Sequence, residues 1–175
     1  MFNCVKTLHK NSLLVYNLIM LILVIGAAAV LAVDLVTKAV LTEGAGFLPG
    51  FISIQPVANS GAAFGIFQGA QVLLIVFTFV ILAGGAFLYF GFRRGRESRL
   101  YNVACAFVLG GALGNLFDRI FFGEVRDMLR FDFLDFLSFP ICNFADVALN
   151  VGIVLLVVYF LFVYKGKDAK NADSR

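Results

Sequence analysis

The chain has 175 residues, of which 61% are hydrophobic and 14% are charged, and its mean hydropathy is +0.95. Soluble domains are about 45–50% apolar and about 25% charged, so this composition indicates a membrane protein and excludes a disordered chain. The 17 glycines, 3 prolines and 3 cysteines also exclude collagen-like and disulfide-framework proteins. The length suits one domain.

Four segments are long and apolar enough for membrane helices, which need about 20 mainly apolar residues. They are residues 12–33, 72–92, 100–117 and 147–164. The first is interpreted as a retained helix, because its apolar run is too long for a signal peptide and no Ala-x-Ala-type cleavage site follows. We therefore expect a single all-α membrane domain with two outer segments, 34–71 and 118–146, and a cytoplasmic loop at 93–99.

Lysine and arginine predict the orientation, because they concentrate on the cytoplasmic side of membrane proteins. Ten of the 14 basic residues lie in the N-terminal tail, the 93–99 loop and the C-terminal tail. Four alternating spans place these three segments on one side of the membrane. We therefore expect both termini in the cytoplasm. Eight of the 11 acidic residues then lie at or beyond the outer ends of the spans.

A cluster of polar residues ends the third span. Asn115, Asp118 and Arg119 stand at positions i, i+3 and i+4, so they share one face of a helix. Ionisable groups at membrane depth are costly unless paired or hydrated, which makes each of them a functional candidate. The alternative is a helix-packing seam with an Asp–Arg pair at its end and glycines that admit a close neighbour: Gly110, Gly111 and Gly114.

A second polar cluster opens the fourth span, where Asn143, Asp146 and Asn150 share one helical face. Asp146 alone is equally well explained as a helix cap or a first-turn carboxylate. Asp127 lies between the two clusters in an outer loop, where a lone aspartate is most often solvated. Two carboxylates brought together at a membrane boundary would instead share a proton and act as general base and general acid. Whether Asp127 and Asp146 meet stays open at this point.

The first outer segment contributes a third group of candidates. Residues 51–57 alternate weakly between apolar and polar side chains, which favours a strand at the interface. Asn59 and Gly61 follow among small residues, which permit close approach by a ligand or another segment, although an ordinary turn is the alternative. Asp34 and Lys38, at positions i and i+4, are expected to form a structural pair at the outer end of the first span.

The sequence gives little support for catalysis by a zinc ion or by a Ser–His or Cys–His pair. His9 is the only histidine and lies in a short basic tail, so neither an HExxH zinc site nor a Ser–His or Cys–His pair is expected. Cys142 has no histidine to serve as its base and is interpreted as a packing residue. Hydrolytic chemistry would therefore depend on carboxylates.

In chain order, these motifs resemble those of the bacterial lipoprotein signal peptidases (type II or prolipoprotein signal peptidases). The matching stretches are DLVTK at 34–38, NSGAAFG at 59–65, GGALGNLFDR at 110–119, VRDM at 125–128 and NFAD at 143–146. The resemblance implies an aspartic endopeptidase with four membrane helices and a small extracytoplasmic β-structure. Its implied reaction removes the signal peptide from a diacylglyceryl-modified prolipoprotein by cleaving before the lipidated cysteine.

The resemblance also implies roles for particular residues. Asp127 and Asp146 would be the catalytic pair, with no metal or organic cofactor. Five residues would bind substrate or support the pair: Asn59, Asn115, Asp118, Arg119 and Asn143. A further set would be structural: Asp34, Lys38, Gly61, Gly111 and Gly114. Three positions depart from the common pattern of the family and bear on substrate preference: Arg126, Cys142 and Val147.

The expected partners are prolipoprotein substrates and membrane lipid, with no nucleic acid. We expect a monomer in the bacterial cytoplasmic membrane whose active site faces outward. Two alternatives remain from other functional classes. A small ion-coupled transporter subunit would place its aspartates nearer the bilayer midplane. A non-catalytic homologue would bind lipoproteins without cleaving them.

Overall fold

Four long helices and a small two-stranded sheet make up the described part of the chain. The computed structural model describes residues 2–41, 48, 50–62, 66–91 and 98–164, with side chains from residue 18 onward. Its elements in chain order are α1 (Phe2–Val40), β1 (Ile52–Asn59), α2 (Gln71–Gly91), α3 (Arg99–Phe121), β2 (Val125–Phe131), the 3-10 helix η3 (Asp132–Leu137), α4 (Phe144–Val158) and the π-helical η4 (Tyr159–Tyr164).

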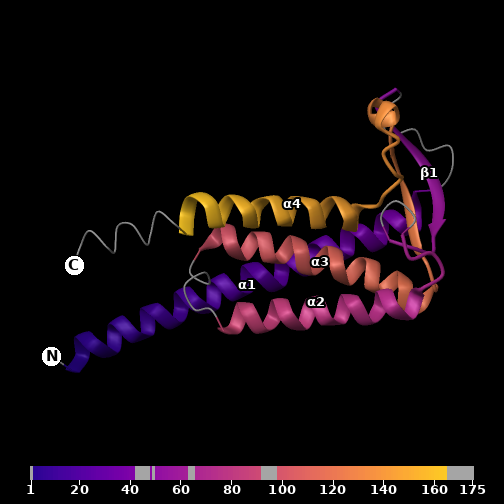
Figure 1. Ribbon diagram of the computed structural model, residues 1–175. Coiled ribbons are helices and arrows are strands. Elements are labelled where there is room, and N and C mark those ends of the chain that lie inside the picture. Colours follow the sequence, from indigo (N-terminus) through magenta and orange to yellow (C-terminus); the bar gives the residue numbers. More distant parts are fainter. Residues whose placement is uncertain (1, 42–47, 49, 63–65, 92–97, 165–175) are drawn as a thin grey trace.

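The helices are long and apolar enough to cross a bilayer. The four segments that meet this criterion are Leu18–Val40, Gln71–Gly91, Arg99–Phe121 and Phe144–Tyr164. Figure 1 shows them running along one another, with the strands lying across one end of the bundle. The prediction of an all-α membrane protein with four spans and a small β-structure is therefore confirmed for the described residues.

At the end of the bundle that carries the sheet, the helices extend beyond the expected spans. Helix α1 continues to Val40, α3 continues to Phe121, and α4 begins at Phe144. Several residues expected in the outer segments therefore lie on helices: Asp34, Lys38, Asp118, Arg119 and Asp146. Each has hydrogen-bond or ion-pair partners within the protein. These partners offset the free-energy cost of a charged side chain at membrane depth, so the helices can continue past the charged residues.

Some residues used in the sequence analysis lie outside the described part of the chain. They comprise the side chains before residue 18, residues 42–47 and 63–65 of the first outer segment, residues 92–97 of the expected cytoplasmic loop, and the tail from residue 165. Most of the basic residues behind the expected orientation are among them. The orientation therefore stays a prediction.

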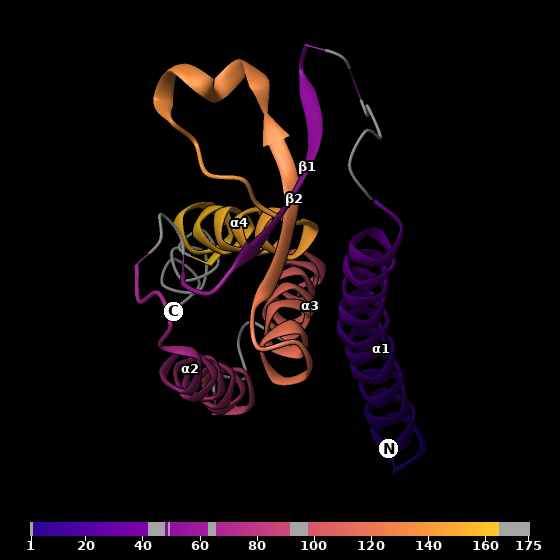
Figure 2. The same ribbon diagram turned by 90° about the vertical axis from the view of Figure 1, so that its right-hand side faces the viewer.

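Helix α3 is the central helix and packs against α1, α2 and α4, as the end-on view in Figure 2 illustrates. Glycines permit the closest contacts. A Cβ atom at Gly110 would lie 2.6 Å from the Val30 Cβ of α1, and one at Gly111 would lie 2.9 Å from the Leu149 Cγ of α4. Such small residues allow helix backbones to approach closely in a membrane, where packing drives association.

Gly111→Ala is expected to destabilise the protein by about 1–3 kcal/mol, because the added methyl group must displace atoms of α4. Gly84→Ala is a matched control. Gly84 also lies in a membrane-crossing helix, but a Cβ atom there would meet nothing within 4 Å. Thermal unfolding of both purified variants in one detergent tests the prediction. Equal melting temperatures for the two variants would contradict the tight α3–α4 contact.

The sheet joins two segments that are far apart in the sequence. Strands β1 and β2 are antiparallel, with Val57 opposite Asp127. A register shift between Ile54 and Val57 accommodates Pro56, which has no N–H to donate. Asp127 therefore lies on a strand and not in the loop suggested by the sequence, because pairing with β1 fixes the extended conformation of β2. Phe144 and Val147 of α4 pack against an apolar cluster of the sheet and the segment beside it, which joins the sheet to the bundle: Ile54, Met128, Leu129 and Cys142.

Candidate active site

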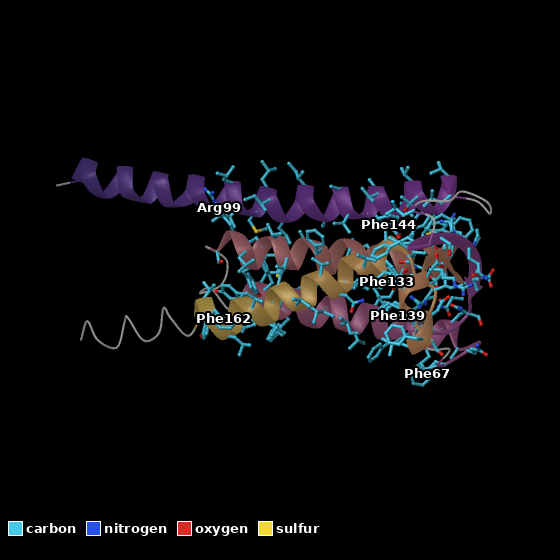
Figure 3. All side chains as sticks on the ribbon, turned by 90° about the horizontal axis from the view of Figure 1, so that it is seen from above. Phe67, Arg99, Phe133, Phe139, Phe144 and Phe162 are labelled. Carbon is cyan, nitrogen blue, oxygen red and sulfur yellow. The ribbon has the colours of Figure 1, made fainter. Side chains whose placement is uncertain are left out.

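Asp127 and Asp146 come from different elements and meet where the sheet crosses the helix ends. Asp127 lies on β2, and Asp146 lies in the first turn of α4. In Figure 3, nitrogen and oxygen atoms gather at this end of the bundle, around the labelled Phe139 and Phe144. We refer to Asp127 and Asp146 as the aspartate pair.

One asparagine links both members of the aspartate pair. Asn143 is the N-cap of α4, and its Nδ2 donates to Asp127 Oδ1 at 2.7 Å. Its Oδ1 accepts from the Asp146 N–H at 2.9 Å, and its own N–H donates to Asp146 Oδ2 at 3.2 Å. The cap that starts the helix therefore also fixes the second carboxylate relative to the first. Asp146 is a capping carboxylate, as one sequence interpretation had it, but its side chain also belongs to this polar site.

Two further asparagines complete the bonding of the pair. Asn59, at the end of β1, donates from Nδ2 to Asp127 Oδ2 at 2.8 Å. Asn115, on α3, donates from Nδ2 to Asp146 Oδ1 at 2.8 Å and accepts from Asn143 Nδ2 at 3.0 Å. Both carboxylates therefore accept two hydrogen bonds each. Three amides from three separate motifs hold them.

Burial raises the pKa of Asp127 to about 6, because the charged carboxylate loses solvation when only 3% of the residue is exposed. The nearby charge of Asp146 adds to the increase. Hydrogen bonds from Asn59 and Asn143 and the charge of Lys38 act in the opposite direction. Asp127 therefore exchanges its proton near neutral pH, which a general acid or base requires.

Next to the aspartate pair lies a set of paired ions, which we call the ion network: the buried Asp34, Lys38 and Asp118, and the partly exposed Arg126. The expected Asp34–Lys38 pair is present, with Lys38 Nζ 2.8 Å from Asp34 Oδ2. Lys38 Nζ also lies 3.1 Å from Asp118 Oδ2, and both side chains are fully buried. Lys38 reaches the aspartate pair through Asn115, whose Oδ1 accepts from Nζ at 3.3 Å. Asp34 Oδ1 in turn accepts from the Ala145 N–H of α4 at 2.9 Å.

Sequence reasoning missed the role of Arg126 in this arrangement. Its Nη2 donates to Asp118 Oδ1 at 2.8 Å, and its backbone N–H donates to Asp118 Oδ2 at 3.0 Å. Its guanidinium lies 4.1 Å from the centroid of the Phe122 ring. The only signal in the sequence was an unusual charge in the VRDM motif. That signal did not reveal Asp118 as its partner.

Arg119 connects the site to the turn that follows β1. Its Nη2 donates to the Gly61 carbonyl at 3.1 Å, and the Gly61 N–H donates to Asn59 Oδ1 at 2.9 Å. A Cβ atom at Gly61 would lie 2.8 Å from the Ile66 carbonyl oxygen, so glycine is needed for this tight turn. The buried Nε of Arg119 has no hydrogen-bond partner among the residues described. An unpaired buried donor at this position is available to a ligand.

The remaining candidates do not contact the carboxylates of the pair. Asn150 Nδ2 donates to the backbone carbonyl of Asp146 at 2.9 Å on an exposed helix face. Burial and the two nearby carboxylates raise the pKa of Cys142 to about 12, which keeps it a thiol at neutral pH. Gly114 leaves room for Asp34, because a Cβ atom there would collide with that carboxylate. Within the described ranges, no group of three or more His, Cys, Asp or Glu side chains is placed to hold a metal ion.

The chain is similar to proteins of one family. A family model described as signal peptidase (SPase) II matches residues 8–162. A lipoprotein signal peptidase of Bacillus pumilus is 40% identical over 73% of this chain and 79% of its own length. One from Enterococcus faecalis is 36% identical over 77% of this chain and 81% of its own length.

A solved structure of a bacterial membrane enzyme superimposes with a TM-score of 0.72 at 30% identity, covering 85% of this chain and 90% of that enzyme. With four membrane-crossing helices, the protein is a multi-pass membrane protein. The resemblance inferred from the short motifs is confirmed, and the chain belongs to the signal peptidase II family.

Proposed function

We propose that this protein is an aspartic endopeptidase that removes the signal peptide from diacylglyceryl-modified prolipoproteins, cleaving before the lipidated cysteine. One observation carries the proposal. Two carboxylates from separate elements are fixed by the same residue, Asn143, at the end of a bundle of membrane-crossing helices. The lipoprotein signal peptidases to which the chain is similar support the choice of substrate.

The environments of the two carboxylates support different starting roles. Asp127 is the buried member with a pKa raised to about 6, so it begins as the proton donor. Asp146 lies at the N-terminus of α4 and accepts N–H bonds from Asn115 and Asn143, an arrangement that suits an anion. Asp146 then takes a proton from water as that water attacks the scissile carbonyl carbon. Asp127 gives its proton to the carbonyl oxygen, and the roles exchange when the amine leaves.

Arg119 and Asn59 are proposed to hold the substrate backbone beside the pair. Arg119 is anchored by Gly61 through Nη2, which leaves the buried Nε free to donate to a substrate carbonyl. Asn59 donates a hydrogen bond to Asp127, so a peptide that binds to Asn59 would lie next to the proton donor, Asp127. Holding the peptide in an attack geometry reduces the entropy lost in the reaction.

The proposed enzyme works as a monomer at the outer boundary of the bacterial cytoplasmic membrane, with both termini in the cytoplasm. The charge distribution of the sequence supports this orientation. The acyl chains and apolar signal helix of the substrate would enter sideways from the lipid. No covalent intermediate is needed, because water is the nucleophile.

Cleavage of a purified substrate tests the proposed function. Full-length protein in detergent is incubated with a diacylglyceryl-modified prolipoprotein and, as a control, with the same precursor lacking the lipid. We expect cleavage of the modified precursor alone, with mass spectrometry placing the new N-terminus at the lipidated cysteine. Binding without any product would indicate a non-catalytic homologue. Ion flux in proteoliposomes together with no cleavage would indicate a transporter subunit.

The value of kcat/KM is expected to fall as the pH rises above about 6. Above its raised pKa, free Asp127 loses the proton that it must donate, and kcat/KM reports the ionisation of the free enzyme. Asn59→Leu removes a hydrogen bond that favours the charged form, so it should move this descending limb to higher pH. Initial rates at low substrate concentration between pH 4 and about 9 provide the measurement. Rates that instead rise through pH 6 would make Asp127 the starting base.

A further inference from the structure

Arg126 joins the ion network through Asp118, with both its guanidinium and its backbone N–H. Its guanidinium donates to Asp118 Oδ1 at 2.8 Å and, through Nε, to Asp118 Oδ2 at 3.4 Å. The Asp118 side chain is fully buried, whereas that of Arg126 is 32% exposed. Arg126 therefore brings a charge from the protein surface to a carboxylate that water does not reach.

A chain of contacts leads from Arg126 to the aspartate pair. Asp118 Oδ2 lies 3.1 Å from Lys38 Nζ, which donates to Asn115 Oδ1 at 3.3 Å. Asn115 Nδ2 then donates to Asp146 Oδ1 at 2.8 Å. The charge of Lys38 also acts on Asp127 and favours its ionised form. The net charge of the ion network therefore affects the ionisation of the aspartate pair.

Among the described residues, the charges that face the pair and the ion network nearly cancel. The cations are Lys38 of α1, Arg119 of α3 and Arg126 of β2, and the anions are Asp34, Asp118, Asp127 and Asp146. A single proton on the aspartate pair makes this set neutral. Of the other titratable side chains nearby, Cys142 stays a thiol and Glu124 is partly exposed. Arg130 pairs with its own neighbours at the far end of the sheet, Asp132 and Asp135.

We propose that Arg126 is a positioning residue that, by neutralising Asp118, sets the pH range in which the aspartate pair holds a single proton. This inference rests on the proposed function, because it takes the singly protonated pair as the working state. Without Arg126, Lys38 would face two buried carboxylates alone, and the ion network would carry a net negative charge. That charge would disfavour the ionised form of Asp127, which would keep its proton to higher pH.

The expected shift is measurable. A unit charge within a Debye length, about 8–10 Å, of a buried carboxyl changes the pKa of that carboxyl by about half a unit to one unit. The partial exposure of Arg126 places the effect at the lower end of this range. The descending limb of kcat/KM should therefore move up by about half a pH unit when Arg126 loses its charge.

The test compares three full-length variants with the wild type in the cleavage assay. Arg126→Met removes the charge and keeps an unbranched side chain, and its descending limb should move up by about half a pH unit. Arg126→Lys keeps the charge and should retain the limb of the wild type. Arg126→Met combined with Asp118→Asn removes one charge of each sign, so its limb should return toward that of the wild type. Arg126→Gln replaces Arg126→Met if thermal unfolding shows that the latter does not fold.

An infrared titration separates the failure of this inference from failure of the proposed function. The protonated carboxyl band of Asp127, isolated by subtracting the spectrum of Asp127→Asn, reports its ionisation without substrate. An upward shift of this titration in Arg126→Met supports the inference even if the wild type cleaves nothing. The inference is overturned if the titrations of wild type and Arg126→Met coincide. It is also overturned if Arg126→Lys shifts as much as Arg126→Met, because shape and not charge would then be responsible.

Discussion

Asp127→Asn and Asp146→Asn are each expected to reduce the single-turnover rate of prolipoprotein cleavage by about 10³-fold or more. Asparagine keeps the size of the side chain and an oxygen that accepts the bonds of Asn59, Asn115 or Asn143. It cannot take a proton from water or return one, so the chemical step loses its acid or its base. The double variant should be no slower than the single variants, because the two groups act as a unit.

Asp135→Asn is the matched control for this result. Asp135 pairs with Arg130 at 2.7 Å on the exposed η3 helix, away from the amides that hold the aspartate pair. Its replacement should leave the cleavage rate unchanged. Cys142→Ala should also remain active, because the Cys142 thiol is a packing group. Folded Asp127→Asn and Asp146→Asn variants that both keep the turnover of the wild type would show that the pair is not catalytic.

Lys38→Met is expected to lower the free energy of unfolding by about 3–5 kcal/mol. Methionine matches the length of the lysine stem, so the change removes mainly the ammonium group. Asp34 and Asp118 would then be buried with one cation fewer, and a buried carboxylate without a partner is far costlier than a lost contact. Reversible unfolding of the purified variant in mixed micelles measures the loss.

Two companion variants show whether the lost charge is the cause. Arg130→Met removes a cation from an exposed ion pair, and its stability should stay close to that of the wild type. Lys38→Met combined with Asp34→Asn leaves Asp118 paired with Arg126 alone, so it should regain part of the stability. If Lys38→Met is as stable as Arg130→Met, the ion network does not hold the helix ends together.

The helices could be predicted from the sequence because their signal is local. A run of about 20 apolar residues has few alternatives to a membrane helix, whatever its neighbours are. Their ends at the sheet could not be predicted in the same way. Asp34 and Lys38 remain within α1 because they pair with each other and with groups of α3 and α4, so distant contacts decide where the span ends.

Strand β2 is a second element that could not be predicted from its local sequence. Its sequence, VRDMLRF, carries three charges, and its position between two spans suggests a loop for Asp127. The strand forms because β1 pairs with it across more than 60 residues of chain, with Val57 opposite Asp127. Propensity for strands depends on such pairing more than on the residues themselves.

The sequence by itself determined the membrane class, the number of spans, the motifs that place the chain in its family, and the absence of a histidine near those motifs. These features depend on composition and on neighbours within a few residues. Only the tertiary structure decided that Asn143 joins Asp127 to Asp146, that Lys38 lies between Asp34 and Asp118, and that Arg126 completes the ion network. These contacts join residues that are far apart in the sequence. They form only when the glycines of α3 allow the helices to pack closely and the sheet lies across the helix ends.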